Sequence, residues 1–269
     1  MTAALTVGLV LFGKPEHKGP AIWVGSYVWT GDSPQFGGFS GLDIGDDGRT
    51  FRAITDRAYT VHGRLIRDDD GRVVGVSASP IVTLRGDDGE PLQPQVRDSE
   101  GLSVAPGGGF YVSFERTEEV DYFADENAAS TILTYIYKSV IPKLPYNQGL
   151  EALALAPDGR LYTIPEYVRI DGRPTPVYMF YDTVWSQPFD LPHVGIHFRV
   201  TDADFGPDGM LYVLERDYWP FLGFRSRVRR FTLGDAGLSG GEILFESRAG
   251  QHDNLEGLGV WRDTTGQSG

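Results

Sequence analysis

Short hydrophobic runs alternate with glycine-containing turns along the whole chain. The runs are rich in Val, Leu, Ile and Tyr, and many are separated by Asp-Gly pairs such as Asp47-Gly48, Asp158-Gly159 and Asp208-Gly209. An Asp-Gly pair supplies the positive φ angle that a tight β-hairpin needs. No stretch combines an amphipathic helical period with capping residues. The pattern therefore predicts an all-β fold built from hairpins.

One pattern recurs along the chain: a short apolar run, a turn and a second apolar run that ends near an acidic residue. Aligning its copies makes five positions equivalent, namely Ser40, Glu100, Glu151, Asp202 and Glu256. The intervals of about 50 to 60 residues suit the four-stranded blades of a β-propeller. The length predicts about five blades. A sixth, degenerate blade between Arg57 and Asp98 is an alternative.

The two ends of the chain bear on how such a ring would close. Residues 5–11 and 21–29 read as strands outside the repeat, and the copy at Glu256 has no second strand. Since open sheet edges invite aggregation, we expect N- and C-terminal strands to close the ring within one blade. We interpret residues 1–269 as a single propeller domain that is shortened at its C-terminus.

A residue repeated at the start of each innermost strand would face the central tunnel. Acidic residues hold this position in most copies, and we expect a carboxylate ring of Glu100, Glu151, Asp202 and Glu256. Converging like charges are costly unless protons or a cation neutralise them. Oxygen ligands favour a hard cation, calcium above zinc. The alternative is structural, with these carboxylates accepting hydrogen bonds from backbone amides of the neighbouring blade.

A second acidic set follows the second strand of each copy: Asp56, Glu115, Glu166 and Glu215. Because the two strands of each hairpin run antiparallel, the second one ends at the same end of the propeller where the first one begins. These acids should therefore flank the first ring. Arginine follows three of them, at Arg57, Arg116 and Arg216. The arginines would either form ion pairs between adjacent blades or bind a phosphate or carboxylate of a ligand.

The charge and composition of the chain limit the classes of partner that it can bind. With 37 acidic and 24 basic residues the net charge is −13, which disfavours nucleic acid and anionic membrane surfaces. The apolar run at residues 1–13 is too short to cross a bilayer, so no membrane insertion is expected. The absence of cysteine excludes disulfides and thiolate zinc sites. Metal cations and small polar molecules remain the favoured partners.

Two further features are candidates for chemistry. His252 stands just before Glu256 and would act as a general base or metal ligand, or else lie on the surface between blades. The aromatic-rich segment Asp217-Tyr218-Trp219-Pro220-Phe221 follows Glu215-Arg216 and is a candidate pocket wall.

Taken together, the motifs resemble a known bacterial family. They include Phe39-Ser40-Gly41-Leu42, Thr55-Asp56-Arg57, Asp98-Ser99-Glu100-Gly101, Leu150-Glu151-Ala152, Leu214-Glu215-Arg216 and His252-Asp253-Asn254-Leu255-Glu256. In order and spacing, over nearly the whole chain, they are similar to proteins with esterase-like activity of phytase, also called phytase-like. The resemblance implies a β-propeller-like fold, a periplasmic or secreted location and hydrolysis of phosphoesters or esters, assisted by calcium as in propeller phytases. The lysine-rich clefts of those phytases, the export signal and the last strand of the family are not evident.

The leading hypothesis is a monomeric, calcium-assisted hydrolase that acts on an ester or phosphoester of a small anionic substrate. The metal ligands would be Glu100, Glu151, Asp202 and Glu256, and the catalytic residues Glu151, Glu166, Glu215 and His252. Substrate would contact Arg57, Arg116, Arg216, Asp56 and Glu115. The alternatives are a non-catalytic propeller that binds a sugar, peptide or protein, and a metal-dependent hydrolase similar to sugar lactonases.

Overall fold

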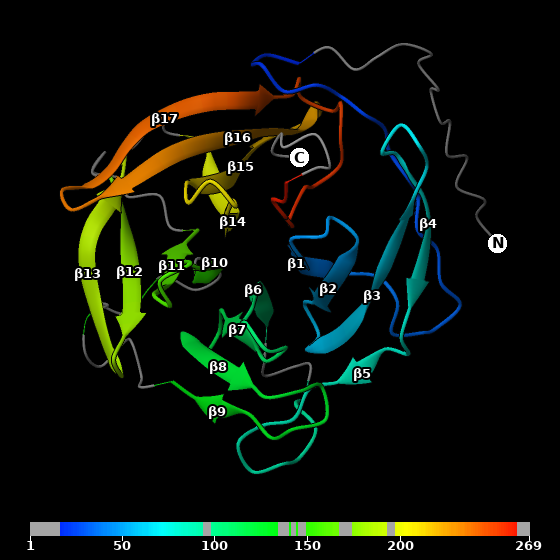
Figure 1. Ribbon diagram of the computed structural model, residues 1–269, viewed down its shortest axis with the longest axis vertical. Helices are drawn as coiled ribbons and strands as arrows, with labels where there is room; N and C mark the ends of the chain where they lie inside the picture. The colour runs from blue at the N-terminus through cyan, green and yellow to red at the C-terminus, as the bar shows by residue number, and fades with distance from the viewer. Residues whose placement is uncertain are drawn as a thin grey trace.

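The computed structural model describes residues 17–93, 98–133, 140, 144, 149–166, 174–192 and 197–262. These residues form seventeen β-strands and no helix. The described part of the chain thus contains no helix long and apolar enough to cross a membrane. The strands make four sheets arranged around a central axis (Figure 1). The prediction of an all-β propeller is confirmed.

The four sheets are numbered here as blades in chain order. Blade 1 contains β1 (Phe39–Ile44), β2 (Thr50–Thr55), β3 (Tyr59–Arg67), β4 (Val73–Ala78) and β5 (Val82–Thr83). Blade 2 contains β6 (Ser99–Val104), β7 (Phe110–Phe114), β8 (Glu119–Phe123) and β9 (Thr131–Ile132). Blade 3 contains β10 (Leu150–Leu155), β11 (Leu161–Pro165), β12 (Thr175–Tyr181) and β13 (Val184–Leu191). Blade 4 contains β14 (Arg199–Phe205), β15 (Leu211–Trp219), β16 (Gly223–Gly234) and β17 (Gly237–Glu246).

The first four strands of each blade pair antiparallel in chain order, with the first strand innermost and the fourth outermost (Figure 1), and the short β5 of blade 1 pairs with β3. In three blades an Asp-Gly pair makes the turn between the first two strands. The φ angle is +61° at Gly48, +87° at Gly159 and +74° at Gly209, a region that glycine adopts without strain. The turn chemistry seen in the sequence therefore sets the hairpin at the centre of these blades.

The number of blades differs from the expectation, because the described residues form four blades instead of five or six. The copy at Glu256 lies in residues 254–261, which form no strand. Their backbone runs beside β14, where the N–H groups of Leu258 and Val260 donate to Asp202 and Asp204, each at 2.7 Å. The stretch 57–98 supplies β3, β4 and β5 of blade 1, so a separate blade there is wrong.

The N-terminal part of the chain also departs from the prediction. Residues 5–11 lie outside the described residues, and residues 21–29 form no strand. The N–H of Ala21 donates to the carbonyl of Leu244 in β17 at 3.0 Å. Arg72, in the turn between β3 and β4, donates to the carbonyl of Val24 at 3.2 Å. This segment links the outer strands of blades 4 and 1 (Figure 1), and closure of the ring by terminal strands stays a prediction.

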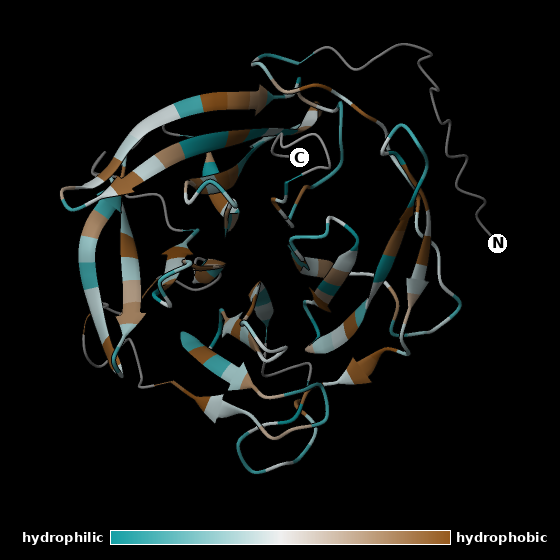
Figure 2. Cartoon of the chain, viewed as in Figure 1, coloured by the Kyte–Doolittle hydropathy of each residue, from teal (hydrophilic) through white to brown (hydrophobic). Residues whose placement is uncertain are grey.

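The hydrophobic core is divided among the junctions between blades. One cluster joins Ile54 of blade 1 to Phe110 and Phe114 of blade 2, and another joins blades 3 and 4 through residues such as Val213. Hydrophobic and hydrophilic residues largely alternate along the long strand β16 (Figure 2). Alternation buries one face of each sheet against its neighbour and leaves polar groups for the rim and the centre.

Buried carboxyl groups connect first strands across blade boundaries. Asp43 of β1 accepts the N–H of Val104 in β6 at 2.8 Å, much as Asp204 accepts that of Val260. Burial raises the pKa of Asp43 to about 6. Burial, with a further contribution from Asp43, raises the pKa of Asp204 to about 8. Folding therefore favours proton binding by both groups.

We expect Asp204→Asn to remove part of the pH dependence of stability. Between its ordinary pKa of 3.8 and about 8, Asp204 keeps its proton longer in the folded than in the unfolded protein. The wild type therefore loses up to about 1.4 kcal/mol of stability per pH unit through this range, and no more above it. The amide still accepts from Val260 but does not titrate. Urea unfolding at about pH 5, 7 and 9 checks this, and parallel pH curves for the two proteins would contradict it.

Candidate functional site

A β-bulge interrupts the first strand of every blade near its start. The pairing with the second strand shifts between Phe39 and Gly41, Ser99 and Leu102, Leu150 and Ala152, and Val200 and Asp202. The side chains that the bulges place out of register are those of Ser40, Glu100, Glu151 and Thr201, and Gly101 is unpaired as well. A bulge re-aims the side chain that it carries. Three of these side chains face a common cavity.

This cavity, called here the carboxylate cavity, has a volume of about 250 Å³. It lies at the end of the ring where the first strands begin. Its lining consists of Gly38, Ser40, Asp56, Asp98, Glu100, Glu115, Glu151, Glu166, Arg216 and Glu256. Seven acidic side chains and one arginine therefore converge on this one space. The structure brings together most, but not all, of the residues that the sequence singled out.

The register of blade 4 shows why two expected members are missing. Val200 pairs with Glu215, as Leu150 pairs with Pro165 in blade 3. Arg216, and not Glu215, is thus the counterpart of Glu166, Glu115 and Asp56. By the same register Thr201, and not Asp202, is the counterpart of Glu151. Aligning acid with acid in the fourth copy was wrong by one residue.

Asp202 and Glu215 point away from the carboxylate cavity. Asp202 accepts the N–H groups of Ala203 at 2.8 Å and Leu258 at 2.7 Å, and burial holds its pKa well above the ordinary value despite both bonds. Glu215 is enclosed by Arg227 and Arg229, whose guanidinium groups both bind its carboxylate. Asp202 thus takes the structural role of an acceptor for backbone amides, which was the alternative for the acidic ring.

Two groups of carboxylates within the cavity approach closely enough to share a cation. One ligand oxygen each from Asp98, Glu100 and Glu115 lie within 4.8 Å of one another, and the same holds for Glu115, Glu151 and Glu166. Glu115 belongs to both groups. Its Oε1 also accepts the N–H of Gly149 at 3.1 Å, which fixes its orientation at the boundary of blades 2 and 3.

The crowding shows in the protonation of these acids. Burial, with repulsion from Asp98 and Glu115, raises the pKa of Glu100 to about 9. Burial raises the pKa of Glu151 well above its ordinary value, and Glu100 and Glu166 add to the shift. Burial also raises the pKa of Glu115, partly offset by the Gly149 N–H. In the absence of a cation, Glu100 therefore holds its proton at neutral pH.

Arg216 is the single arginine in the cavity lining. It donates to Glu166 at 3.1 Å, to Glu256 at 2.9 Å and to Asn254 at 2.7 Å. Burial alone would lower the pKa of Arg216, but Glu166 and Glu151 outweigh burial and the net shift is upward. The expected ion pair between adjacent blades is thus present here, from blade 4 to blade 3, and the same side chain holds residues 254–256 in place.

The other two arginines lie outside the lining. Arg57 contacts Asp56 at 3.4 Å and donates to the carbonyl of Gly37 at 2.9 Å. Arg116 donates to Asp98 at 3.1 Å. Each contacts an acidic side chain that lines the cavity.

His252 is separate from the carboxylates. Its ring stacks on Trp23 with centroids 5.3 Å apart, and its buried Nε2 has no hydrogen-bond partner among the described residues. Burial, with a contribution from His17, lowers the pKa of His252. Its proposed roles as base or metal ligand are not supported by its position.

Asp98 is a lining residue that the repeat did not reveal. It precedes β6, and its carbonyl accepts the N–H of Glu115. The carbonyls of Gly38 before β1 and Gly149 before β10 accept the N–H of Asp56 and Glu166 in the same way, so these two glycines are its counterparts. Because glycine carries no side chain, no repeated signal marks this position. Its place directly before Ser99-Glu100 was the one available clue.

Comparisons with solved structures give distant resemblances. Virginiamycin B lyase from Staphylococcus aureus shares 12% identity over 86% of this chain, with a TM-score of 0.43. A gluconolactonase from Xanthomonas campestris shares 12% identity over 81% of this chain, with a TM-score of 0.41. A luciferin-regenerating enzyme shares 13% identity over 87% of this chain and 69% of its own, with a TM-score of 0.48. This chain covers 62% of the length of the lyase and 63% of that of the lactonase.

No curated protein matches the sequence significantly. A protein-family profile does match: that of the family Phytase-like, described as esterase-like activity of phytase, over residues 34–269. The match contains all four blades and every residue of the carboxylate cavity. The protein therefore belongs to the Phytase-like family.

Proposed function

We propose that the protein binds a divalent cation, calcium, in the carboxylate cavity and hydrolyses an ester or phosphoester of a small anionic substrate there. The observation that supports the proposal is the pair of carboxylate groups that share Glu115, set in a chain of the Phytase-like family. Glu115, Glu151 and Glu166 are all buried, so their charges are poorly screened by water.

The oxygen atoms that line the cavity are of the type that calcium prefers as ligands. Calcium takes six to eight oxygen ligands, and carboxylates are preferred among them. The cavity lining offers carboxylate oxygens and the Ser40 hydroxyl, with no histidine or cysteine. Glu115, Glu151 and Glu166 would hold the ion, with Asp98 and Glu100 beside them. When bound, the ion would polarise an ester or phosphoryl oxygen and favour ionisation of water.

The residues of the chain itself divide the remaining tasks. Seven acids repel an anionic substrate, so Arg216 is the group in the lining that attracts it. Glu100, whose pKa burial raises to about 9 in the absence of a cation, is the candidate general acid. Arg57 and Arg116 remain candidates for substrate contact at the cavity edge. Asp202, Glu215 and His252 have no part in the proposal, because none of them lines the cavity.

The test is hydrolysis of p-nitrophenyl acetate and p-nitrophenyl phosphate by the wild type and Glu151→Gln, with calcium or with EDTA. We expect activity to require calcium and to fall by at least about 100-fold in Glu151→Gln. The matched control is Glu242→Gln, an exposed acid that pairs with Arg230, and it should keep full activity.

Each outcome has a distinct meaning. Turnover that survives both EDTA and Glu151→Gln would overturn the role of the cavity. Calcium-dependent stabilisation of the fold without turnover of any ester would favour a non-catalytic binding protein. A δ-lactone substrate in the same assay separates a lactonase from an esterase or phosphatase.

A further inference from the structure

Five acids of the carboxylate cavity form two overlapping groups. Asp98 and Glu100, near the start of β6, and Glu115, after β7, make up the first, called here the blade-2 group. Glu115 also joins Glu151 of β10 and Glu166, after β11, in the second, called here the boundary group because it spans blades 2 and 3. Within each group, one oxygen from each residue lies within 4.8 Å of the others.

The size of each group fits one calcium ion. Oxygens bound to one calcium lie about 2.3–2.6 Å from it, so they lie within about 5 Å of one another. Each group meets this limit by itself. Asp98 and Glu100 fall only in the blade-2 group, however, and Glu151 and Glu166 only in the boundary group. As the side chains lie, a single ion therefore cannot take a ligand from all five residues.

Glu115 is placed to serve two ions at once. Its carboxylate is buried, and its Oε1 accepts the N–H of Gly149 at 3.1 Å. A carboxylate offers about four lone-pair positions, so one amide donor leaves room for a cation on either side. Proteins that bind two metal ions in one site hold them about 3.5–4 Å apart. A residue shared by both groups is what such an arrangement requires.

A buried carboxylate without a partner points to a ligand at the boundary group. Glu151 lines the cavity and is only 7% exposed. Among the described residues no hydrogen bond or ion pair reaches its carboxylate, whereas Glu166 binds Arg216 at 3.1 Å. Buried polar groups are normally paired, and an unpaired buried charge is costly. A cation in the boundary group would supply the missing partner.

The blade-2 group has the same need of a cation. Arg116 donates to Asp98 at 3.1 Å and so holds this carboxylate in place. Glu100 has no hydrogen bond or ion pair to any described residue, and Asp98 and Glu115 both repel its charge. An ion held among the three carboxylates would turn this repulsion into attraction.

One ion does not balance the charge of the cavity. The lining contains seven acidic residues and one arginine. When all the acids are ionised, a divalent ion offsets two of their charges and Arg216 offsets one, so most of the seven remain. A second ion offsets two more. The charge of the lining therefore favours a second ion once the first is bound.

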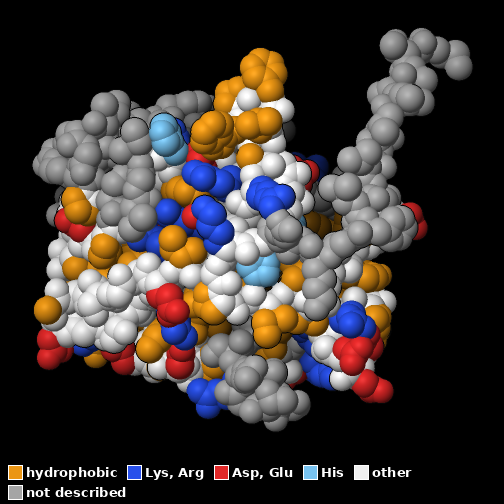
Figure 3. All heavy atoms as spheres, turned by 90° about the horizontal axis from the view of Figure 1, so that it is seen from above, with side chains coloured by type: hydrophobic (Ala, Val, Ile, Leu, Met, Phe, Trp, Pro, Cys, Tyr) orange, Lys and Arg blue, Asp and Glu red, His pale blue; other side chains and the backbone are white. Residues whose placement is uncertain are grey.

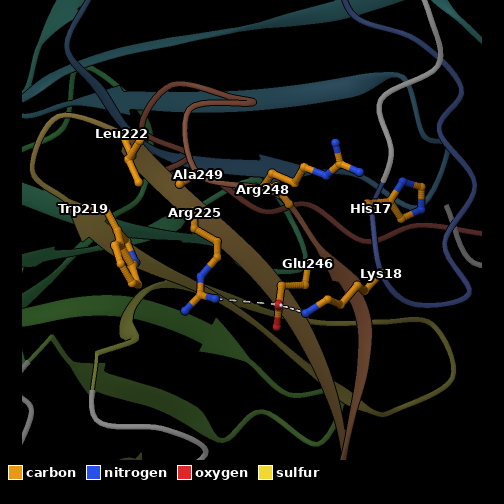
Figure 4. A pocket seen from close by; sticks show the side chains of 9 residues that line it. His17, Lys18, Trp219, Leu222, Arg225, Glu246, Arg248 and Ala249 are labelled. Carbon is orange, nitrogen blue, oxygen red and sulfur yellow. Dashed lines mark hydrogen bonds and ion pairs between the residues drawn. The ribbon is translucent and has the colours of Figure 1, made fainter.

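A larger cavity at the edge of blade 4 offers no comparable site. This rim pocket, of about 520 Å³, includes Trp219 of the aromatic-rich segment 217–221, and Glu246 is the single carboxylate in its lining. Lys18 at 3.0 Å and Arg225 at 4.0 Å already balance Glu246 (Figure 4). Acidic side chains also lie on the outer surface, several of them beside Lys or Arg (Figure 3). Exposed charges are hydrated and screened, so we expect specific ion binding in the carboxylate cavity alone.

We propose that the carboxylate cavity binds two calcium ions, one in the blade-2 group and one in the boundary group, with Glu115 as the ligand that bridges them. This inference rests on the proposed function, to which it adds the second ion. All three acids of the boundary group are buried, whereas Asp98 and Glu100 are half-buried, so the boundary group should bind its ion more tightly. Glu100 then acts as general acid only while the blade-2 group holds no ion.

Isothermal titration calorimetry of the whole chain, freed of metal with EDTA and titrated with calcium chloride, tests the proposal. We expect two ions per chain in the wild type. Asp98→Asn and Glu151→Gln each change one group only, so each should weaken one ion by about tenfold or more and the other by less than about threefold. Glu115→Gln should weaken both ions by about tenfold or more. The matched control is Glu242→Gln, an exposed acid paired with Arg230, which should bind both ions as the wild type does.

The number of ions separates this inference from the proposed function. Two ions, weakened separately by Asp98→Asn and Glu151→Gln, support both. One ion in the wild type overturns the second site and leaves the proposed function standing, whereas no ion overturns both. Two ions whose affinities are unchanged in Glu115→Gln would also overturn the inference, because they would then be bound outside the two groups.

Discussion

Replacing Glu215 with alanine is expected to lower the free energy of unfolding by about 3–5 kcal/mol, because it takes the carboxylate away from two buried guanidinium groups. Arg227 donates to Glu215 at 2.7 and 3.2 Å, and Arg229 donates at 2.7 and 2.6 Å. Both arginine side chains are almost completely buried. Urea unfolding of the two proteins measures the difference. Glu242→Ala, which removes an exposed partner of Arg230, should change stability by less than about 1 kcal/mol.

The same residue separates a structural from a catalytic role. The sequence placed Glu215 among the catalytic acids, whereas its carboxylate is enclosed by two arginines away from the carboxylate cavity. Glu215→Gln should therefore reduce stability and leave the turnover of the folded fraction close to wild type. A stable Glu215→Gln protein without activity would contradict this assignment and restore the catalytic one.

Arg216→Gln is expected to move the affinities for cation and substrate in opposite directions. The lining loses its single positive charge among seven acids, so calcium binds more tightly. An anionic substrate loses its attractive partner, so KM rises by about tenfold or more. Calorimetry with calcium and steady-state kinetics at saturating calcium measure the two effects.

Two further variants sharpen this prediction. Arg230→Gln, at a partly exposed arginine of blade 4 outside the cavity lining, should leave both affinities unchanged. Arg216→Lys keeps the charge but cannot bridge Glu166, Glu256 and Asn254 at once, so it should restore KM only in part. If KM for an anionic ester is the same in Arg216→Gln as in wild type, Arg216 does not contact the substrate.

The sequence was sufficient for the fold class and for most of the carboxylate cavity. Asp-Gly turns and acids at a regular interval predicted hairpins in a ring, and Glu100, Glu115, Glu151, Glu166 and Glu256 do meet. The prediction for the fourth copy was wrong because successive side chains of a strand point to opposite faces. An alignment that is shifted by one residue therefore exchanges the side chains that line the cavity with those that are buried. Nothing in the residue types of Thr201-Asp202 or Glu215-Arg216 shows where the bulge lies.

The blade count failed for a different reason. A copy of the repeat motif predicts the first strand of a blade, but a blade also needs further strands that pair with it. The copy at residues 254–261 pairs with none of the described strands. His252 was misplaced because nearness in sequence to Glu256 does not fix where a loop residue points. The ring of His252 instead stacks on Trp23 of the N-terminal segment, and no motif in the sequence indicates that contact.

The attachment of residues 254–261 has a consequence for how the carboxylate cavity comes to exist. This segment is attached to blade 4 by hydrogen bonds from its backbone N–H groups to the carboxylates of Asp202 and Asp204. Arg216 adds hydrogen bonds to the side chains of Asn254 and Glu256. A stretch without a ladder of its own opens at lower cost than a paired strand. Brief detachment would remove Glu256 and uncover the ring centre, so this segment can serve as the entrance through which ions and water exchange.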